Sequence, residues 1–352
     1  MSRFRTYFRK NLRRLGMVVL KLLTRSHMGG LENFPRRGPY IVAGNHRGIM
    51  EVALMVVAAP VEIEIIGAGD IPLDRRYRYF AKLYGYIPYH RGRLDRRALR
   101  RAQEVLTRGG VVGIFPEGGI WQSGRSSAHR GVAWLAFTTG APVVPVGFGG
   151  VSEAIHKIVT LQYPRLEGYV GPPISPRSEK GATPRKTRME EFAETVLDRI
   201  DELIPNWDRE LHDMVVEESY ELVAGVRSRS DQRVRRVEER LYRPDLLAKL
   251  FHFTVIVNVF YFNLKRKAAA PLRRPTKFQR VDRVEAAVEV VLNYTTYRNS
   301  GFFAYRFGSE EARELEKSLR SLRELCRDLR AQDPTIVIRS EPIYRYRRRG
   351  EA

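Results

Sequence analysis

The chain has 352 residues, of which 43% are hydrophobic and 10% aromatic, so it is long and apolar enough to fold into two domains. Its formal net charge of +22 indicates anionic partners, which are nucleic acid, an anionic membrane surface, or an acidic carrier or substrate. The single cysteine, Cys326, excludes an intramolecular disulfide framework and a cysteine metal cluster, and it indicates a reducing compartment.

Residues 1–25 predict a basic amphipathic helix. This stretch contains no acidic residue, and apolar residues recur in it at steps of three and four: Phe4, Phe8, Leu12, Leu15, Val19 and Leu22. Such a helix can lie in the interface of an anionic bilayer, or it can pack its apolar stripe on the rest of the protein. The sequence leaves both alternatives open. The sequence has no run of about 18 apolar residues, so we expect no membrane span. It has no cleavage site after the basic start, so we expect no signal peptide.

From residue 26 to about 205, short apolar runs alternate with amphipathic segments, which predicts an α/β domain with a mostly parallel sheet flanked by helices. Functional sites in such folds collect at the carboxyl ends of the strands. The predicted strands are Tyr40 to Ala43, Val61 to Ile66, Tyr86 to Tyr89, Val111 to Phe115, Val143 to Gly147 and Leu166 to Val170. The predicted helices are Met50 to Ala58, Arg75 to Tyr84, Leu94 to Thr107, Ala128 to Thr139 and Arg188 to Leu203.

The first of these strands ends in a candidate catalytic pair. His46 follows the strand, and Glu51 falls in the first turn of the next helix. A carboxylate at this spacing can hold one ring nitrogen of the histidine while the other nitrogen acts as a base. A turn-capping histidine and a solvent-facing glutamate would give the same spacing, so the pair alone does not decide the function.

Three further features fall near strand ends. Arg91 follows the strand that ends at Tyr89, and a guanidinium binds phosphate well. The strand ending at Phe115 continues as Pro116-Glu117-Gly118-Gly119, where glycines allow close approach of a ligand and Glu117 can bind a hydroxyl. Pro145 interrupts an apolar strand, which is tolerated at a sheet edge or beside a site.

These blocks, in this order, resemble the glycerophospholipid acyltransferase family, whose members acylate glycerol 3-phosphate or lysophosphatidic acid. The family's His-four residues-Asp, glycine-to-arginine, Phe-Pro-Glu-Gly and Val-Pro-Val blocks look like His46 to Glu51, Gly85 to Arg91, Phe115 to Gly118, and Val144-Pro145-Val146. The resemblance covers residues 25 to 205. It implies transfer of a fatty acyl group to a hydroxyl of a phosphate-bearing lipid acceptor, in phospholipid biosynthesis.

The resemblance also implies roles for single residues. Glu51 would orient His46, which would act as general base on the acceptor hydroxyl, without a covalent acyl-enzyme. Arg91 would bind the acceptor phosphate, Glu117 and the Gly118 amide would position the glycerol hydroxyls, and Pro145 would shape the acyl side. We expect no metal and no cofactor.

Two departures from the family pattern bear on activity and on the acceptor. The family's aspartate is Glu51 here, whose longer side chain still orients the imidazole if the helix lies slightly further away, and otherwise leaves activity reduced or lost. Phe-Pro-Glu-Gly often continues with Thr-Arg-Ser, whereas this chain has Gly119 to Arg125 of different sequence. Arg125 or Arg130 is a candidate replacement for that arginine.

The expected acyl donor is acyl-CoA or an acyl carrier protein, both of which are anionic. Arg97, Arg100 and Arg101 lie on one predicted helix and are candidates to meet the donor, although a solvated face is the default interpretation of such a run. We expect a lysophospholipid acceptor and an anionic membrane surface as further partners, and no nucleic acid. The expected location is cytoplasmic, peripheral or monotopic on the inner face of the cell membrane.

Residues 206–352 carry no recognised catalytic motif and predict an accessory α+β or helical region. The pattern indicates a helix from Trp207 to Val226, a helix from Val281 to about Leu292, a strand from Phe302 to Phe307, a helix opening at Ser309 and a strand from Thr335 to Ile338. The apolar stretch Phe251 to Leu264 is expected to be buried or to lie on a surface. The tail Tyr344 to Arg349 interleaves tyrosine with arginine, which occurs in nucleic-acid or lipid-phosphate contacts, but a disordered basic end is favoured.

One alternative to an enzyme remains at this stage. Because Glu51 departs from the family pattern, the chain could be a catalytically weak or silent membrane lipid-binding protein. Loss of turnover in His46→Ala with lipid binding intact would separate the two functions.

Overall fold

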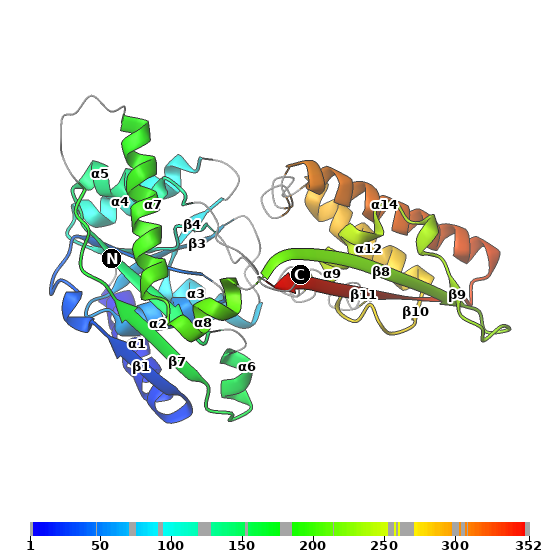
Figure 1. The fold of residues 1–352 in the computed structure, drawn as a ribbon, viewed down its shortest axis with the longest axis horizontal. Helices are drawn as coiled ribbons and strands as arrows, with labels where there is room; N and C mark the ends of the chain where they lie inside the picture. The colour runs from blue at the N-terminus through cyan, green and yellow to red at the C-terminus, as the bar shows by residue number, and fades with distance from the viewer. Residues whose placement is uncertain are drawn as a thin grey trace. The chain divides into compact units, whose positions relative to one another are not determined.

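The computed structural model describes residues 3–46, 48–69, 75–90, 94–118, 128–151, 154–176, 185–213, 215–252, 257, 260, 271–297, 303, 307 and 309–348. The chain divides into two compact units (Figure 1). Unit 1 comprises residues 1–67, 80–89 and 95–215, and unit 2 comprises residues 68–79, 90–94 and 216–352. No helix in the described part of the chain is long and apolar enough to span a membrane. The domain boundaries predicted from the sequence, at 25 and 205, stay predictions.

Unit 1 is built on a seven-stranded sheet with the order β1-β7-β6-β2-β5-β3-β4. The pairs β6–β2, β2–β5 and β5–β3 are parallel, and β7 runs antiparallel to β6. The predicted α/β fold with a mostly parallel sheet is therefore confirmed. The strands are β1 (Arg25–Gly29), β2 (Tyr40–Gly44), β3 (Ile63–Ala68), β4 (Ile87–Tyr89), β5 (Val111–Ile114), β6 (Val143–Gly149) and β7 (Arg165–Val170).

Helices cover both faces of this sheet because successive residues of a buried strand point to opposite sides. Tyr40 and Val42 belong to a core that includes residues of α1, α2 and α6, whereas Ile41 and Ala43 belong to a core with α4, α5 and α7. The helices are α1 (Arg3–Leu23), α2 (Met50–Ala58), α3 (Arg75–Tyr84), α4 (Arg96–Thr107), α5 (Gly131–Thr139), α6 (Ala154–Val159), α7 (Arg185–Leu203) and α8 (Asn206–Asp213), with a 3-10 turn at Leu31–Asn33.

The apolar stripe of α1 is divided between two faces. Phe8 and Leu12 pack against the core, and the Cα of Gly16 lies so close to α2 that an added Cβ would come within 2.8 Å of Val57. Leu15 and Leu22, from the same stripe, are 60% and 65% exposed. The two alternatives left open by the sequence are therefore not exclusive, because part of the stripe packs and part faces outward.

Unit 2 is a four-stranded sheet with the order β10-β11-β8-β9. Its strands are β8 (Val215–Arg227), β9 (Arg235–Arg236), β10 (Gln279–Arg280) and β11 (Val337–Arg348), and its described helices are α9 (Pro244–His252), α12 (Val281–Tyr297) and α14 (Ser309–Gln332), with a 3-10 turn at Glu238–Arg240. The predicted helices beginning at Val281 and Ser309 are confirmed, whereas the accessory role expected for residues 206–352 stays a prediction.

The predicted helix from Trp207 to Val226 is wrong beyond Asp213, where the chain enters β8. Leu222, Ala224 and Val226 are buried at steps of two, which is the period of a strand and not of a helix. The predicted strand from Phe302 to Phe307 is also wrong at its described residues, because Phe303 and Phe307 are helical.

The last strand is longer than predicted. It begins at Val337 and continues to Arg348, so most of the tail for which disorder was favoured is ordered, and only Arg349 lies outside the described residues. Sheet pairing explains the difference, because β11 is hydrogen-bonded to the long strand β8 on one side, while β10 on the other side pairs only with Val337 and Ile338.

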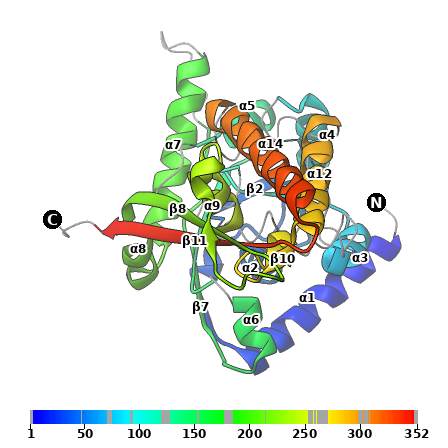
Figure 2. The same ribbon diagram turned by 90° about the vertical axis from the view of Figure 1, so that its right-hand side faces the viewer.

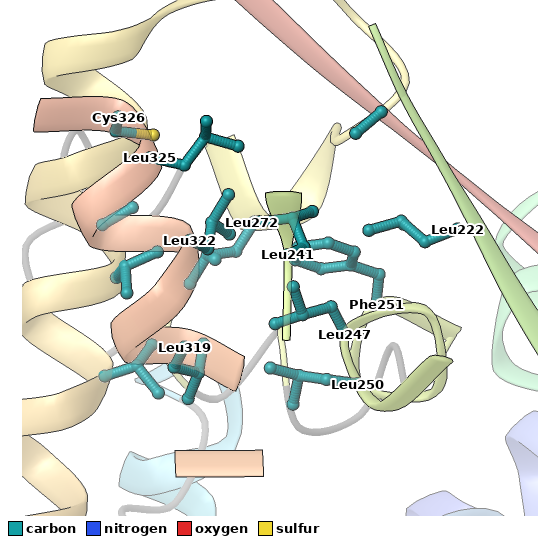
Figure 3. Close-up of a cluster of buried hydrophobic side chains, with 14 of the residues drawn as sticks. Leu222, Leu241, Leu247, Leu250, Phe251, Leu272, Leu319, Leu322, Leu325 and Cys326 are labelled. Carbon is teal, nitrogen blue, oxygen red and sulfur yellow. The ribbon is translucent and has the colours of Figure 1, made fainter. Parts of the chain in front are cut away.

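The core of unit 2 forms between the sheet and the helices (Figure 3). Leu222 of β8, Leu247 of α9 and Leu322 of α14 meet there, and Cys326 is buried among them. Within the stretch Phe251 to Leu264, the described Phe251, Val257 and Phe260 are buried in this core.

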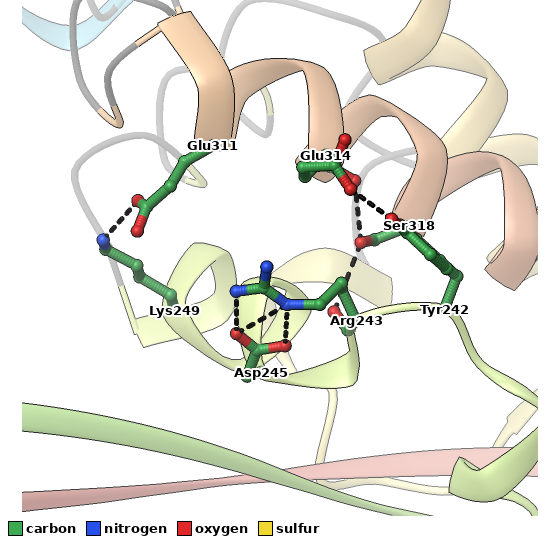
Figure 4. A network of polar contacts seen from close by, with 7 residues as sticks. All are labelled: Tyr242, Arg243, Asp245, Lys249, Glu311, Glu314 and Ser318. Carbon is green, nitrogen blue, oxygen red and sulfur yellow. Dashed lines mark hydrogen bonds and ion pairs between the residues drawn. The ribbon is translucent and has the colours of Figure 1, made fainter.

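Polar contacts fix α9 to α14 at the edge of that core (Figure 4). Arg243 pairs with Asp245 in the first turn of α9, and its carbonyl accepts a hydrogen bond from the buried Ser318 hydroxyl at 3.2 Å. Lys249 pairs with Glu311 at 2.7 Å. All of these contacts lie within unit 2.

Candidate functional site

The candidate site lies where β2 ends, between β5 and β6. The Asn45 side chain fixes this end of the strand, because its amide donates to the Phe148 carbonyl at 2.9 Å and its oxygen accepts from the Phe148 amide at 2.7 Å. Both residues are almost completely buried. The pair of hydrogen bonds links the chain just before His46 to β6, 103 residues away.

His46 contacts Phe115, the residue that directly follows β5. Its ring stacks on Phe115 with 4.2 Å between ring centroids and 20° between ring planes. Its backbone amide donates to Glu117 Oε1 at 3.2 Å. The structure therefore brings together His46 and Glu117, which are 71 residues apart and belong to two of the four sequence blocks.

Glu51 is completely buried in the first turn of α2. Its Oε1 accepts a hydrogen bond from the Gly48 amide at 2.9 Å, and an added Cβ on Gly48 would lie 3.4 Å from its Oε2. The longer side chain thus folds back over the turn that follows His46. A buried carboxylate near a helix N-terminus is favourably placed in the field of the helix.

The turn after β5 exposes the backbone near Glu117. Gly118 has a φ of 69°, a left-handed conformation that suits glycine, and its amide donates to the Phe115 carbonyl at 3.0 Å. The Gly118 amide, expected to position glycerol hydroxyls, is therefore used within the turn in this structure. The Pro116 carbonyl accepts from the His129 amide at 2.9 Å, which fixes the far end of the same loop.

Pro145 lies in β6, opposite Ala43 of β2. Since β6 has β2 on one side and β7 on the other, the proline is not at a sheet edge. Of the two explanations that the sequence allowed, a position beside the site remains. The Pro145 carbonyl accepts from the Gly171 amide at 2.9 Å.

Some candidate residues cannot be placed. Arg91 and the segment Gly119 to Arg125 lie outside the described residues. Arg130 pairs with Glu190 of α7 at 3.4 Å, and its suggested acceptor role stays a prediction. At the end of β4, burial raises the pKa of Tyr89, which keeps its phenol neutral.

Sequence reasoning missed Asn45 and the stacking surface of Phe115. Asn45 directly precedes the catalytic candidate, and a polar residue at the end of a fully apolar strand is a signal that it needs a partner. The identity of that partner depends on the pairing of β2 with β6 and is not visible in the sequence.

Comparison with known proteins finds relatives for the part of the chain that carries this candidate site. Residues 25–149 match the model of the Acyltransferase family. The 1-acyl-sn-glycerol-3-phosphate acyltransferase of Bacillus subtilis is 24% identical over 187 residues, which are 53% of this chain and 92% of that protein. The chloroplastic 1-acyl-sn-glycerol-3-phosphate acyltransferase of Arabidopsis thaliana is 28% identical over 130 residues, and the match covers 36% of its length.

Among solved structures, the 1-acyl-sn-glycerophosphate acyltransferase PlsC from Thermotoga maritima is 21% identical, with a TM-score of 0.43 over 56% of this chain and 80% of that one. The family match and the curated relatives confirm the resemblance found in the sequence blocks. Residues 25–149 therefore carry an acyltransferase domain similar to those of the glycerophospholipid acyltransferases. The chain is an O-acyltransferase.

Proposed function

We propose that the protein transfers a fatty acyl group from acyl-CoA or an acyl carrier protein to a hydroxyl of a phosphate-bearing lipid such as 1-acylglycerol 3-phosphate, in phospholipid biosynthesis. The observation that carries the proposal is the junction of the first and third sequence blocks, in which the His46 amide binds Glu117 and the His46 ring stacks on Phe115. The names of the curated relatives support the lysophospholipid acceptor.

In this mechanism His46 acts as the general base. It removes the proton of the acceptor hydroxyl as the hydroxyl oxygen attacks the thioester carbonyl. The tetrahedral intermediate collapses with cleavage of the carbon–sulfur bond, and the proton on His46 passes to the departing sulfur. The products are the ester and a free thiol, and no acyl-enzyme forms. Glu51, buried behind the turn, would stabilise the positive charge that develops on the imidazole.

The acceptor would bind at the same edge of the sheet. Arg91 would bind its phosphate and Glu117 its glycerol hydroxyl, both by analogy with the family blocks, while Pro145 would shape the acyl side. For the Gly118 amide to bind substrate, it would have to exchange its bond to Phe115 for one to the ligand. The positive φ of Gly118 supports the turn in either case.

The donor would approach α4, whose exposed face is basic. Arg96, Arg97, Arg100 and Arg101 are exposed, while Ala98, Leu99 and Ala102 on the opposite face are buried. Because α4 leads into β5 and lies against it, its first turns are directed to the edge where β5 ends. Both anionic donors would be attracted to this face.

The protein would work on an anionic membrane, as a cytoplasmic protein that is peripheral or monotopic on the inner face of the cell membrane. The outward apolar side chains of α1 lie among the exposed Lys10, Arg14 and Lys21, which is the composition of an interfacial helix. We expect no nucleic-acid partner.

The proposal is tested by incubating purified protein with lysophospholipid and either palmitoyl-CoA or a palmitoylated acyl carrier protein. Thiol release gives the rate, and lipid mass spectrometry identifies the product. The variants are His46→Ala, Glu51→Asp and, as a matched control, His27→Ala, which removes an exposed histidine on β1. A well-placed base contributes about 10²- to 10⁴-fold, so His46→Ala should lower kcat by that factor and His27→Ala should leave it unchanged.

Two results would contradict the proposal. Equal rates for wild type and His46→Ala would remove the histidine from the chemistry. A silent wild type combined with an active Glu51→Asp would show that the carboxylate has lost its function in this chain, and a lipid-binding role would then take precedence. A product other than an acylated phosphate-bearing lipid would correct the acceptor.

A further inference from the structure

The last residue of α6 and the short loop that follows it carry apolar side chains that face solvent. Val159 is 75% exposed, Leu161 is 61% exposed and Tyr163 is 48% exposed. We refer to residues 159–163 as the 159–163 loop. Nothing in the family blocks or in the proposed chemistry uses these side chains.

Two of the apolar residues in the 159–163 loop, Leu161 and Tyr163, have an unfavourable backbone conformation. Leu161 has a φ of 55° and Tyr163 a φ of 47°, which is the left-handed region that glycine and asparagine adopt at helix ends. The Gln162 amide donates to the Lys157 carbonyl at 2.8 Å and so closes the end of α6. A leucine in this conformation costs folding free energy, and a side chain that is 61% exposed recovers little of that cost by burial, which points to a use other than stability.

The 159–163 loop lies beside the end of α1. The Arg25 amide donates to the Pro164 carbonyl at 3.0 Å, and the Arg25 Nε donates to the Tyr163 carbonyl at 3.2 Å. The parallel pairing of β1 with β7 continues from this point. Two views at right angles show the end of α1 and the loop after α6 at the same end of unit 1 (Figures 1 and 2).

The adjoining part of α1 is also apolar on its outside. Leu15, Val18 and Leu22 recur at steps of three and four and are 60%, 53% and 65% exposed. We call these three residues the outer face of α1. The helix and the loop therefore expose apolar side chains at the same end of unit 1, from two segments that are about 140 residues apart in the chain, and we call the two together the exposed apolar surface.

The charges around this surface select its partner. Lys21 and Arg25 are exposed beside it, Lys157 is half-buried on α6, and residues 3–31 contain no acid. The helix face and the tip of a loop both project outward, so they suit insertion into a soft layer better than contact with a second folded surface. The exposed face of α4 is also basic, but its helical residues expose no large apolar side chain.

We propose that the 159–163 loop is a second membrane-inserting element, which enters the interface of an anionic bilayer next to the outer face of α1. The inference rests on the proposed function in so far as the acceptor lipid is taken from that bilayer. Attachment at two neighbouring points, unlike attachment by one helix, fixes how unit 1 is oriented on the membrane.

The test uses the full chain and vesicles of phosphatidylglycerol and phosphatidylcholine, with sedimentation to measure the bound fraction. The variant Val159→Ser/Leu161→Asn/Tyr163→Asn removes the apolar side chains and places residues that tolerate positive φ at both strained positions. The matched control, Val234→Ser, alters a valine of unit 2 that is 46% exposed. We expect the triple variant to bind about tenfold more weakly or worse and the control to bind like wild type.

Thermal unfolding of the same variants distinguishes a membrane role from a structural one. The unfolding midpoint of the triple variant should stay equal or rise, because asparagine adopts the left-handed conformation at lower cost. Weaker binding together with a lowered midpoint would mean that the loop serves the fold, and the inference would be overturned. Unchanged binding, or a dimer of the wild type that the triple variant dissociates, would overturn it as well.

Wild-type transfer to lysophospholipid dispersed in detergent is measured alongside, since it requires no bilayer. If the wild type transfers no acyl group in that assay but vesicle binding still depends on the loop, the proposed function is refuted and the membrane-binding role of the loop stands. Transfer in detergent together with loop-independent vesicle binding would refute the membrane surface alone.

Discussion

Asn45 offers the sharpest test of how the fold positions His46, the proposed general base. Replacing Asn45 with alanine removes both hydrogen bonds to the Phe148 backbone, whose amide and carbonyl would be left buried without them. Each such group costs about 1–3 kcal/mol, so the free energy of unfolding should fall by about 2–6 kcal/mol. Asn45→Asp keeps an acceptor for the amide but places a carboxylate against the carbonyl, and should be no milder.

The matched control is Asn33→Ala. Asn33 is half-buried in the same unit, and its amide donates to the Val170 carbonyl at 2.8 Å. Loss of this single bond should cost about 0.5–1.5 kcal/mol. Trp134 and Trp207 lie in unit 1, and residues 216–352 contain no tryptophan, so tryptophan fluorescence during urea unfolding follows unit 1 specifically.

Asn45→Ala should also lower kcat, because the backbone it releases carries His46. A misplacement of about 1 Å can cost about 10²-fold in rate. At temperatures where the variant is still folded, we expect that loss in kcat with a smaller change in KM, whereas Asn33→Ala should retain wild-type kcat. Equal stability losses in the two variants, or full activity of folded Asn45→Ala, would refute the positioning role.

Three further predictions concern groups away from the site. Arg9 is almost completely buried, donates to the carbonyls of Tyr84 and Gly85, and pairs with Glu64 at 3.3 Å. Arg9→Met should therefore lower the free energy of unfolding, measured in urea, by about 3 kcal/mol or more, and the double variant Arg9→Met/Glu64→Met should recover part of this loss. Burial raises the pKa of the Cys326 thiol to about 12, so iodoacetamide at pH 8 should label it only after unfolding, as mass spectrometry would show. Burial lowers the pKa of His252 in the folded chain. As the pH falls, the unfolded chain therefore binds a proton before the folded chain does, so the free energy of unfolding should be constant above about pH 6.5 and decrease below it. Hydrogen exchange of α9 between pH 7 and pH 5 would measure the fall, which should be smaller in His252→Phe.

The architecture of unit 1 was readable from the sequence because its central strands are continuous apolar runs separated by helix-length segments. Their observed ends agree with the predicted ones within about three residues. The strand β1 was not predicted, since Arg25 to Gly29 contains no apolar run, and it is a strand because it pairs with β7 at the edge of the sheet. Tertiary pairing decided its conformation, and local propensity did not.

Unit 2 was harder to predict for a related reason. The segment before Leu222 is rich in glutamate, which favours a helix locally, while the alternation of Leu222, Ala224 and Val226 favours a strand. The alternation prevailed because the strand buries that face in the core. A period of two over three buried residues was the decisive signal.

In the site, the sequence order of the blocks was enough to predict that His46 and Glu117 would meet at the ends of parallel strands. The specific contact could not be predicted, because it runs through the His46 backbone amide and not through its ring. The same holds for Glu51, whose extra methylene is accommodated by folding onto the Gly48 amide. Which backbone groups such side chains bind is fixed only once the turns around them have formed.

The N-terminal helix shows why packing and membrane contact need not compete. An α-helix turns by about 100° per residue, so its apolar residues can form two stripes on different sides. In α1 the inner stripe carries Arg9, whose guanidinium also lies 4.7 Å from the Tyr84 ring centroid. Moving α1 away from unit 1 would leave the Tyr84 and Gly85 carbonyls and Glu64 without this cation, at a cost typical of breaking a buried ion pair. The helix is therefore a fixed part of unit 1, and its exposed apolar residues have a defined position relative to the site.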